Sequence, residues 1–152
     1  MLDHITVGVA GTGFIGPVHV EGLRRLGIRV KGIMGSSPAK SEAARQSMGL
    51  ETAYASFEAM LDDSEVQAVH LAVPNVLHYE MARQALDAGK HVMCEKPLAM
   101  TSSETADLVQ LAAKSGLAAG VCYNIRFYPR NLAARSPTEA GTPGEVPSGT
   151  GR

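Results

Sequence analysis

Tryptophan is absent from this 152-residue sequence, and aromatic residues of all kinds make up only 5% of it. Proteins that bind single-stranded nucleic acids usually stack the bases on aromatic side chains, and nucleic-acid binding in general calls for clustered positive charge. The formal net charge is −1, so the chain has no excess of positive charge. Both features argue against a nucleic-acid partner.

Cysteine and long apolar runs are also scarce. The cysteines are Cys94 and Cys122, each at the end of a short apolar stretch, and two such residues make neither a disulfide framework nor a zinc motif. We therefore expect two free thiols, no metal site and a reducing, cytoplasmic location. No apolar run approaches the ~18 residues that a membrane-spanning helix needs, and no signal peptide is recognisable, so no membrane association is expected.

Short apolar stretches alternate with segments of helical periodicity through the first 122 residues. Strands are predicted at Ile5–Ala10, Ile28–Met34, Thr52–Tyr54, Gln67–Val73, His91–Cys94 and Leu117–Cys122. Helices are predicted at Val18–Leu26, after the N-cap Ser37, after Ser56, at Val76–Ala88 and after the capping box that begins at Thr101. This alternation predicts an α/β fold with a doubly wound, mostly parallel sheet.

A glycine-rich motif joins the first strand to the first helix. It reads Gly11-Thr12-Gly13-Phe14-Ile15-Gly16, which is GxGxxG in the strand–turn–helix context that dinucleotide binding requires. Gly11 permits the tight turn, Gly13 allows a pyrophosphate to approach the backbone, and Gly16 lets helix and strand pack closely. The N–H groups at the start of the helix then meet the phosphate charge. The motif predicts a Rossmann fold that binds a nicotinamide dinucleotide.

The end of the second strand bears on which cofactor is bound. NAD-selective sites usually place a carboxylate there, at the ribose hydroxyls, but the segment from Met34 to Lys40 contains none. Ser36, Ser37 and Lys40 are instead suited to a 2′-phosphate, by hydroxyl donation and positive charge, and Gly35 is expected to lie beside the cofactor as well. The alternative is that Ser37 is only a helix cap and Lys40 only a solvated side chain. NADP is therefore favoured, and NAD remains open.

The composition changes at the end of the chain. Ser136–Arg152 reads SPTEAGTPGEVPSGTGR, and such a segment has too little apolar surface to offset its ordering entropy. We therefore expect a dinucleotide-binding domain at residues 1–130 and a disordered tail at 131–152.

Two longer motifs carry a family resemblance. Residues 72–78 read AVPNVLH and residues 88–98 read AGKHVMCEKPL. Together they closely resemble the Gfo/Idh/MocA oxidoreductases, which include glucose-fructose oxidoreductase and inositol dehydrogenase. The segment Phe14–Gly16 with His19, and the NIRFYP run at 124–129, are similar to family segments as well. The resemblance covers roughly residues 4–130.

The resemblance implies a Rossmann domain followed by a larger α+β substrate domain. Family members move a hydride between the nicotinamide and a sugar, polyol or related alcohol. The lysine of the EKP motif, here Lys96, serves in proton transfer, and the proline after it, Pro97, often follows a cis peptide bond. Residues implied to lie beside the cofactor are Ala72, Pro74, Asn75, His78, Glu95 and Lys96.

The chemistry of these residues leaves alternatives open. Lys96 follows a strand, at the sheet edge where doubly wound folds bind ligands, but alone it would also suit a solvated loop. Glu95 would orient the Lys96 ammonium or oppose a lowering of its pKa. Asn75 also suits the cap of the following helix, His78 a packing or capping role, and His19 a structural role.

The chain stops where the family's substrate domain is expected to begin. This predicts a truncated, interrupted or frame-shifted gene or a partial chain, inactive alone, which takes a sugar-like substrate only if a second domain is supplied. The alternatives are a non-catalytic nucleotide-binding module and a non-functional remnant. Apolar surface that lacks its partner domain would favour a homo-oligomer.

Overall fold

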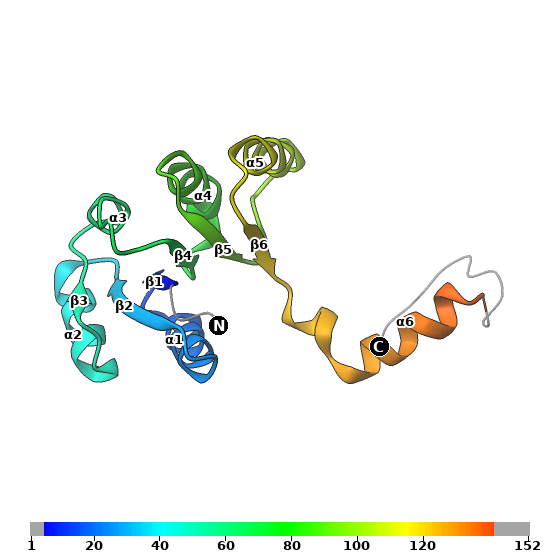
Figure 1. The fold of residues 1–152 in the computed structure, drawn as a ribbon, viewed down its shortest axis with the longest axis horizontal. Helices are drawn as coiled ribbons and strands as arrows, with labels where there is room; N and C mark the ends of the chain where they lie inside the picture. The colour runs from blue at the N-terminus through cyan, green and yellow to red at the C-terminus, as the bar shows by residue number, and fades with distance from the viewer. Residues whose placement is uncertain (1–4, 142–152) are drawn as a thin grey trace. The chain divides into compact units, whose positions relative to one another are not determined.

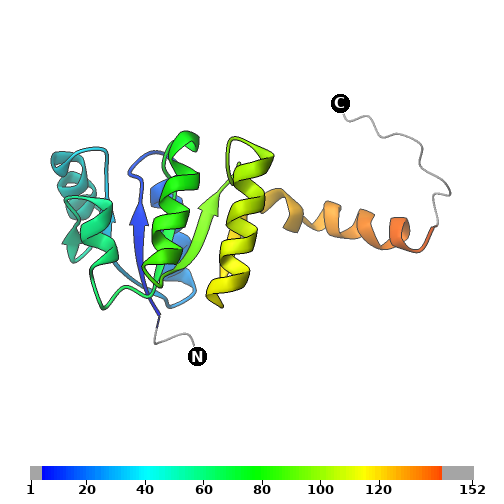
Figure 2. The same cartoon turned by 90° about the horizontal axis from the view of Figure 1, so that it is seen from above.

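The computed structural model describes residues 5–141. Within them, contacts divide the chain into a first unit that ends at Cys122 and a second that begins at Tyr123. The first unit is a six-stranded parallel sheet with helices on both faces (Figures 1 and 2). Its strands are β1 (Thr6–Ala10), β2 (Arg29–Met34), β3 (Thr52–Ala53), β4 (Ala68–Leu71), β5 (His91–Glu95) and β6 (Ala119–Cys122).

The strand order is β3-β2-β1-β4-β5-β6, and every neighbouring pair is parallel. This is the doubly wound order of dinucleotide-binding folds, in which the direction of winding reverses between β1 and β4. Such sheets bind ligands in the crevice outside the carboxyl ends of the strands at that reversal. The predicted α/β fold class is confirmed.

Helices cover both faces of the sheet, so its central strand is buried on both sides. Every residue of β1 is buried, which explains why the strand is apolar from Val7 to Ala10. α1 and α2 lie against one face, while α4 and α5 lie against the other (Figures 1 and 2). The helices of the first unit are α1 (Ile15–Arg25), α2 (Pro38–Met48), α3 (Phe57–Leu61), α4 (His78–Asp87) and α5 (Ser102–Ser115), with a 3₁₀ turn η1 (Asn75–Leu77) before α4.

Helix caps that the sequence predicts are present. Ser37 accepts a hydrogen bond from the backbone N–H of Lys40, and Ser56 accepts one from Ala59. Thr101 and Glu104 form the complete capping box of α5. These caps satisfy N–H groups that lack partners within the helix, and they fix where each helix begins.

The second unit contains η2 (Asn124–Phe127) and α6 (Pro129–Glu139). The structure thus has a helix over the first part of the segment expected as a disordered tail, and residues 142–152 lie outside the described part. Pro129 stands at the first helical position, where its missing N–H costs nothing. Arg135 donates to the Glu139 carboxylate one turn later, at 2.7 Å. Pro129 and Arg135 come before the Pro- and Gly-rich stretch that begins at Ser136, so the composition of that stretch does not describe the start of α6.

In the described residues, no helix combines the length and the apolar character needed to cross a membrane. Both cysteines are free, as expected. Cys94 is fully buried and Cys122 is half-buried. Burial and the neighbouring Glu95 carboxylate raise the pKa of the Cys94 thiol to about 12.

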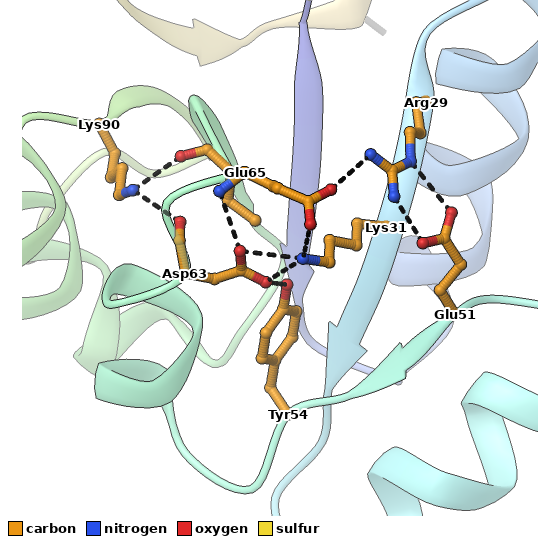
Figure 3. Close-up of polar contacts among 8 residues, drawn as sticks. Arg29, Lys31, Glu51, Tyr54, Asp63, Glu65 and Lys90 are labelled. Carbon is orange, nitrogen blue, oxygen red and sulfur yellow. Dashed lines mark hydrogen bonds and ion pairs between the residues drawn. The ribbon is translucent and has the colours of Figure 1, made fainter.

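A network of charged side chains lies at the amino end of β2, at the opposite edge of the sheet from the glycine motif (Figure 3). Asp63 accepts from the Lys31 ammonium at 2.7 Å, from the Tyr54 hydroxyl at 2.8 Å and from the backbone N–H of Glu65 at 2.9 Å. Lys90 donates to the Asp63 and Val66 carbonyl oxygens at 3.0 and 2.7 Å. The network ties the loop after α3 to the sheet.

Replacing Asp63 with asparagine is expected to lower the free energy of unfolding at pH 7 by on the order of 2 kcal/mol. Burial alone raises the pKa of the Asp63 carboxyl, but the bonds from Lys31, Tyr54 and Glu65 outweigh it and lower the pKa to about 2. The stabilisation is therefore complete above pH ~4 and is lost as the pH falls toward 2. Urea unfolding of the unaltered chain and of Asp63→Asn between pH 2 and 7 would measure this. Their free energies of unfolding should converge as the pH falls, and a difference that stays constant with pH would refute the prediction.

A candidate dinucleotide site at the carboxyl edge of the sheet

A cleft of ≈950 Å³ opens at the carboxyl ends of β1, β2 and β4, at the reversal of strand order. Ten residues predicted to bind the cofactor line it. They are Gly11, Thr12, Gly13, Phe14, Ile15, Gly35, Ser36, Lys40, Ala72 and Pro74. Met34, Val73 and Leu77 line the cleft too, as do Ala43, Ser47 and Met48 of α2.

The backbone of the glycine turn packs closely against neighbouring backbone, with no room for side chains at two of its glycines. The Gly11 N–H donates to the Met34 carbonyl oxygen at 2.8 Å. Gly11 has φ +119°, and a Cβ there would lie 2.1 Å from the Ala72 carbonyl oxygen. A Cβ on Gly16 would lie 2.0 Å from the Gly11 carbonyl oxygen, so both glycines are required by the fold itself.

Gly13 differs from the other two glycines of the motif. A Cβ there would meet no protein atom within 4 Å, so packing does not explain a glycine at this position. α1 begins just beyond it, with no side-chain cap at Phe14 and no acidic residue in its first turn. The N–H groups of that turn therefore suit an anionic ligand, and the open side of Gly13 is where a pyrophosphate would approach.

The loop between β2 and α2 also lines the cleft. The Lys40 ammonium donates to the Ser36 hydroxyl at 3.0 Å, and both residues line the cleft. Ser37 caps α2 and lies outside the lining. Ser41, which was not predicted, accepts from the Gly35 N–H at 2.8 Å and donates to the Ser37 carbonyl oxygen at 3.2 Å, so it holds the loop in shape.

The end of β4 brings Ala72, Val73 and Pro74 to the cleft. The expectation that Asn75 caps the next helix is wrong, because Asn75 is the first residue of η1 and α4 begins only at His78, with no side-chain cap. His78 has no exposed surface and does not line the cleft. Its Nδ1 lies 2.6 Å from the Pro97 carbonyl oxygen and its Nε2 lies 3.0 Å from that of Val73.

Lys96 lies just beyond β5, at the same edge of the sheet as the cleft but outside its lining. Its side chain is exposed, and the Lys96–Pro97 peptide bond is cis. The Glu95 carboxylate accepts from the Lys96 backbone N–H at 3.2 Å and lies 3.0 Å from Nε2 of His19. Glu95 therefore contacts the backbone of Lys96 and the ring of His19, a residue of α1 for which the sequence favours a structural role and leaves a cofactor contact open.

Comparison with known proteins agrees with this geometry. The model of the Gfo/Idh/MocA oxidoreductase family, described as an NAD-binding Rossmann fold, matches residues 5–123. A D-xylose 1-dehydrogenase (NADP⁺) of Haloferax volcanii is 34% identical over 123 residues, which are 80% of this chain and 38% of that protein. Among solved structures, an NAD-binding oxidoreductase from Klebsiella pneumoniae superposes with a TM-score of 0.83 at 32% identity, over 91% of this chain and 39% of that one.

A levoglucosan dehydrogenase solved with NADH and levoglucosan has a TM-score of 0.84 at 29% identity, over 93% of this chain and 41% of that one. The chain thus spans about two-fifths of the length of these relatives. The matched region contains the glycine motif, the β4 end and the EKP motif. The chain therefore belongs to the Gfo/Idh/MocA oxidoreductase family, and residues 5–123 form its NAD-binding Rossmann fold.

Proposed function

We propose that the cleft binds a nicotinamide dinucleotide with its pyrophosphate against Gly13 and the first turn of α1. The observation that carries the proposal is the contrast between the glycines. A side chain at Gly11 or Gly16 would clash with neighbouring backbone atoms, so the fold requires glycine there. Gly13 instead faces open space, next to the start of a helix that no side chain caps. That arrangement fits the phosphate groups and leaves the β2–α2 loop for the adenosine ribose.

The proposed cofactor is NADP in preference to NAD. Met34–Ser41 contains no carboxylate that would bind both ribose hydroxyls, and Ser36 and Lys40 face the cleft in mutual contact. A 2′-phosphate would accept hydrogen bonds from the Ser36 hydroxyl and the Lys40 ammonium. Relatives are described with either cofactor, NADP⁺ in the xylose dehydrogenase and NADH in the levoglucosan dehydrogenase.

The proposed activity is dehydrogenation of a sugar, polyol or related alcohol, completed by a substrate-binding part supplied beyond these residues. Bound in the cleft, the cofactor supplies the hydride acceptor or donor. Lys96 would transfer the proton of the reacting hydroxyl. It directly follows the carboxyl end of β5, at the edge of the sheet where the nicotinamide of the bound cofactor would lie. The free thiols suit a reducing compartment, so we place the activity in the cytoplasm.

Calorimetric titration with NADP⁺ and NAD⁺ tests the cofactor proposal. The chain is expected to bind NADP⁺ more tightly, and Lys40→Met is expected to weaken NADP⁺ binding about 10-fold by removing one charge-assisted contact. Binding of NAD⁺ should change little in that variant. Lys114→Met, at an exposed lysine in the last turn of α5, is the matched control.

Two results would contradict the proposal in different ways. Equal affinities for NADP⁺ and NAD⁺, unaffected by Lys40→Met, would contradict the proposed preference for a 2′-phosphate but not the proposed binding of a dinucleotide. Failure of the folded chain to bind either cofactor would remove the function proposed for the cleft.

A further inference from the structure

Four side chains with metal-binding or acid–base chemistry meet beside the sheet, outside the lining of the cofactor cleft. They come from four elements: His19 from α1, His70 from β4, Glu95 from β5 and Cys122 from β6. The two histidine rings contact each other through their Nδ1 atoms at 2.8 Å. Nε2 of His19 is 3.0 Å from the Glu95 carboxylate, which also hydrogen-bonds the Cys122 thiol.

Three of these residues present a compact set of ligand atoms. Nε2 of His19, a carboxylate oxygen of Glu95 and Sγ of Cys122 all lie within 4.8 Å of one another. Ligand atoms around a tetrahedral zinc ion are separated by about 3.5 Å, given the usual Zn–N, Zn–O and Zn–S bond lengths. Small side-chain rotations would therefore bring the three atoms to bonding distance of one ion.

The surroundings hold two of the ligands in place. The side chains of His19 and Glu95 are only 8% and 14% exposed. The other carboxylate oxygen of Glu95 accepts from the Lys96 N–H, and Nδ1 of His19 faces His70. Metal-bound histidines and carboxylates in proteins are oriented by such outer hydrogen bonds.

The ring of His70 contacts the nitrogen of His19 that does not face Glu95. The two Nδ1 atoms lie 2.8 Å apart, so one of them donates and the other accepts. With its proton on Nδ1, His19 would donate to His70 and keep the lone pair of Nε2 for an ion. The contact between the two rings is therefore compatible with metal binding.

We propose that His19, Glu95 and Cys122 form a binding site for a zinc-like divalent ion, with water as the fourth ligand. One nitrogen, one sulfur and one carboxylate oxygen favour zinc or cobalt over magnesium or calcium, which prefer all-oxygen sites. The carboxylate and a Cys122 thiolate would balance the charge of the ion, and binding would release the thiol proton to solvent. No metal site is expected from the sequence, because the three ligands lie far apart along the chain. The site is independent of the function proposed for the cleft.

Titration of the whole chain with Co²⁺ tests this proposal directly. Co²⁺ occupies zinc sites and gives a thiolate-to-metal absorption band when a cysteine is bound. One equivalent of Co²⁺ is expected to produce that band, and Zn²⁺ is expected to abolish it by displacement. Cys122→Ala should lose the band, and His19→Gln and Glu95→Gln should each weaken Co²⁺ binding at least 10-fold.

Matched controls separate the site from adventitious binding. Cys94→Ala removes the other cysteine, which is buried in β5 outside the cluster, and should keep the band. His91→Gln removes a histidine outside the cluster and should bind Co²⁺ as the unaltered chain does. Circular dichroism of each variant checks that it is folded. The proposal is overturned if the folded chain gives no thiolate band, or if the band survives in folded Cys122→Ala.

Discussion

Gly13→Val is expected to weaken binding of the nicotinamide dinucleotide at least 100-fold without loss of stability. The cofactor's pyrophosphate would lie against Gly13, where two branched methyl groups would occupy its place. The protein itself has room for them, because no atom lies within 4 Å of the position of a Cβ and the backbone there is not left-handed. A 100-fold loss corresponds to about 2.7 kcal/mol of binding free energy. Calorimetry would measure the affinity, and thermal unfolding the stability.

Gly22→Ala is the matched control for this experiment. Gly22 lies in α1, which follows the glycine turn; like Gly13 it is exposed and has open space where its Cβ would be. Alanine there should stabilise the helix by about 1 kcal/mol and leave cofactor affinity unchanged. If Gly13→Val binds the cofactor as well as Gly22→Ala does, the pyrophosphate does not approach the glycine turn, and the site proposed for it is wrong.

Much of the fold could be predicted because its signals are local. β1 is apolar from Val7 to Ala10 because both its faces are covered. Ser37, Ser56 and Thr101 mark helix starts by their own side-chain bonds. Predictions failed where local patterns compete. α1 begins at Ile15 and not Val18, because the glycine motif itself turns into the helix, and Asn75 enters a 3₁₀ turn that propensity does not distinguish from a helix start.

In the candidate site, too, the residues in continuous motifs could be predicted, and those brought together by the fold could not. The glycine motif and the β2–α2 loop are continuous in sequence, and the cleft includes most of their predicted residues. Ser41, His70 and Cys122 were not predicted to have any role in a site. The partners of His70 and Cys122 are set by the pairing of strands and by the packing of α1, which no short segment encodes. Ser41 bonds only to Gly35 and Ser37, within the same loop, but its sequence position does not distinguish it from an ordinary helix residue. Lys90, within the AGKHV run, binds two carbonyl oxygens at the far edge of the sheet, so part of the family motif serves the fold.

His78→Leu is expected to lower the free energy of unfolding by about 2–3 kcal/mol, because the fully buried ring is replaced by a side chain without an N–H group to donate to the neighbouring carbonyl oxygens. The His78 ring joins Val73, in the wall of the cleft, to Pro97, next to Lys96. Carbonyl oxygens only accept, so one ring donates to both of them only as an imidazolium, and a neutral ring donates to one. His78 is thus a positioning residue that ties the cofactor wall to the segment bearing Lys96, and cofactor affinity should fall with stability.

A graded series distinguishes this role from simple packing. His78→Gln keeps one side-chain N–H group and should recover part of both losses, whereas leucine supplies bulk without a donor. His91→Leu removes a ring whose Nδ1 accepts a single bond, from the Ala118 N–H at 2.9 Å, and should cost less than about 1.5 kcal/mol. Urea unfolding and NADP⁺ titration of the three variants supply both readouts. If leucine and glutamine at position 78 prove equally stable and bind equally well, the ring only fills space, and the two carbonyl bonds do not position the Lys96 segment.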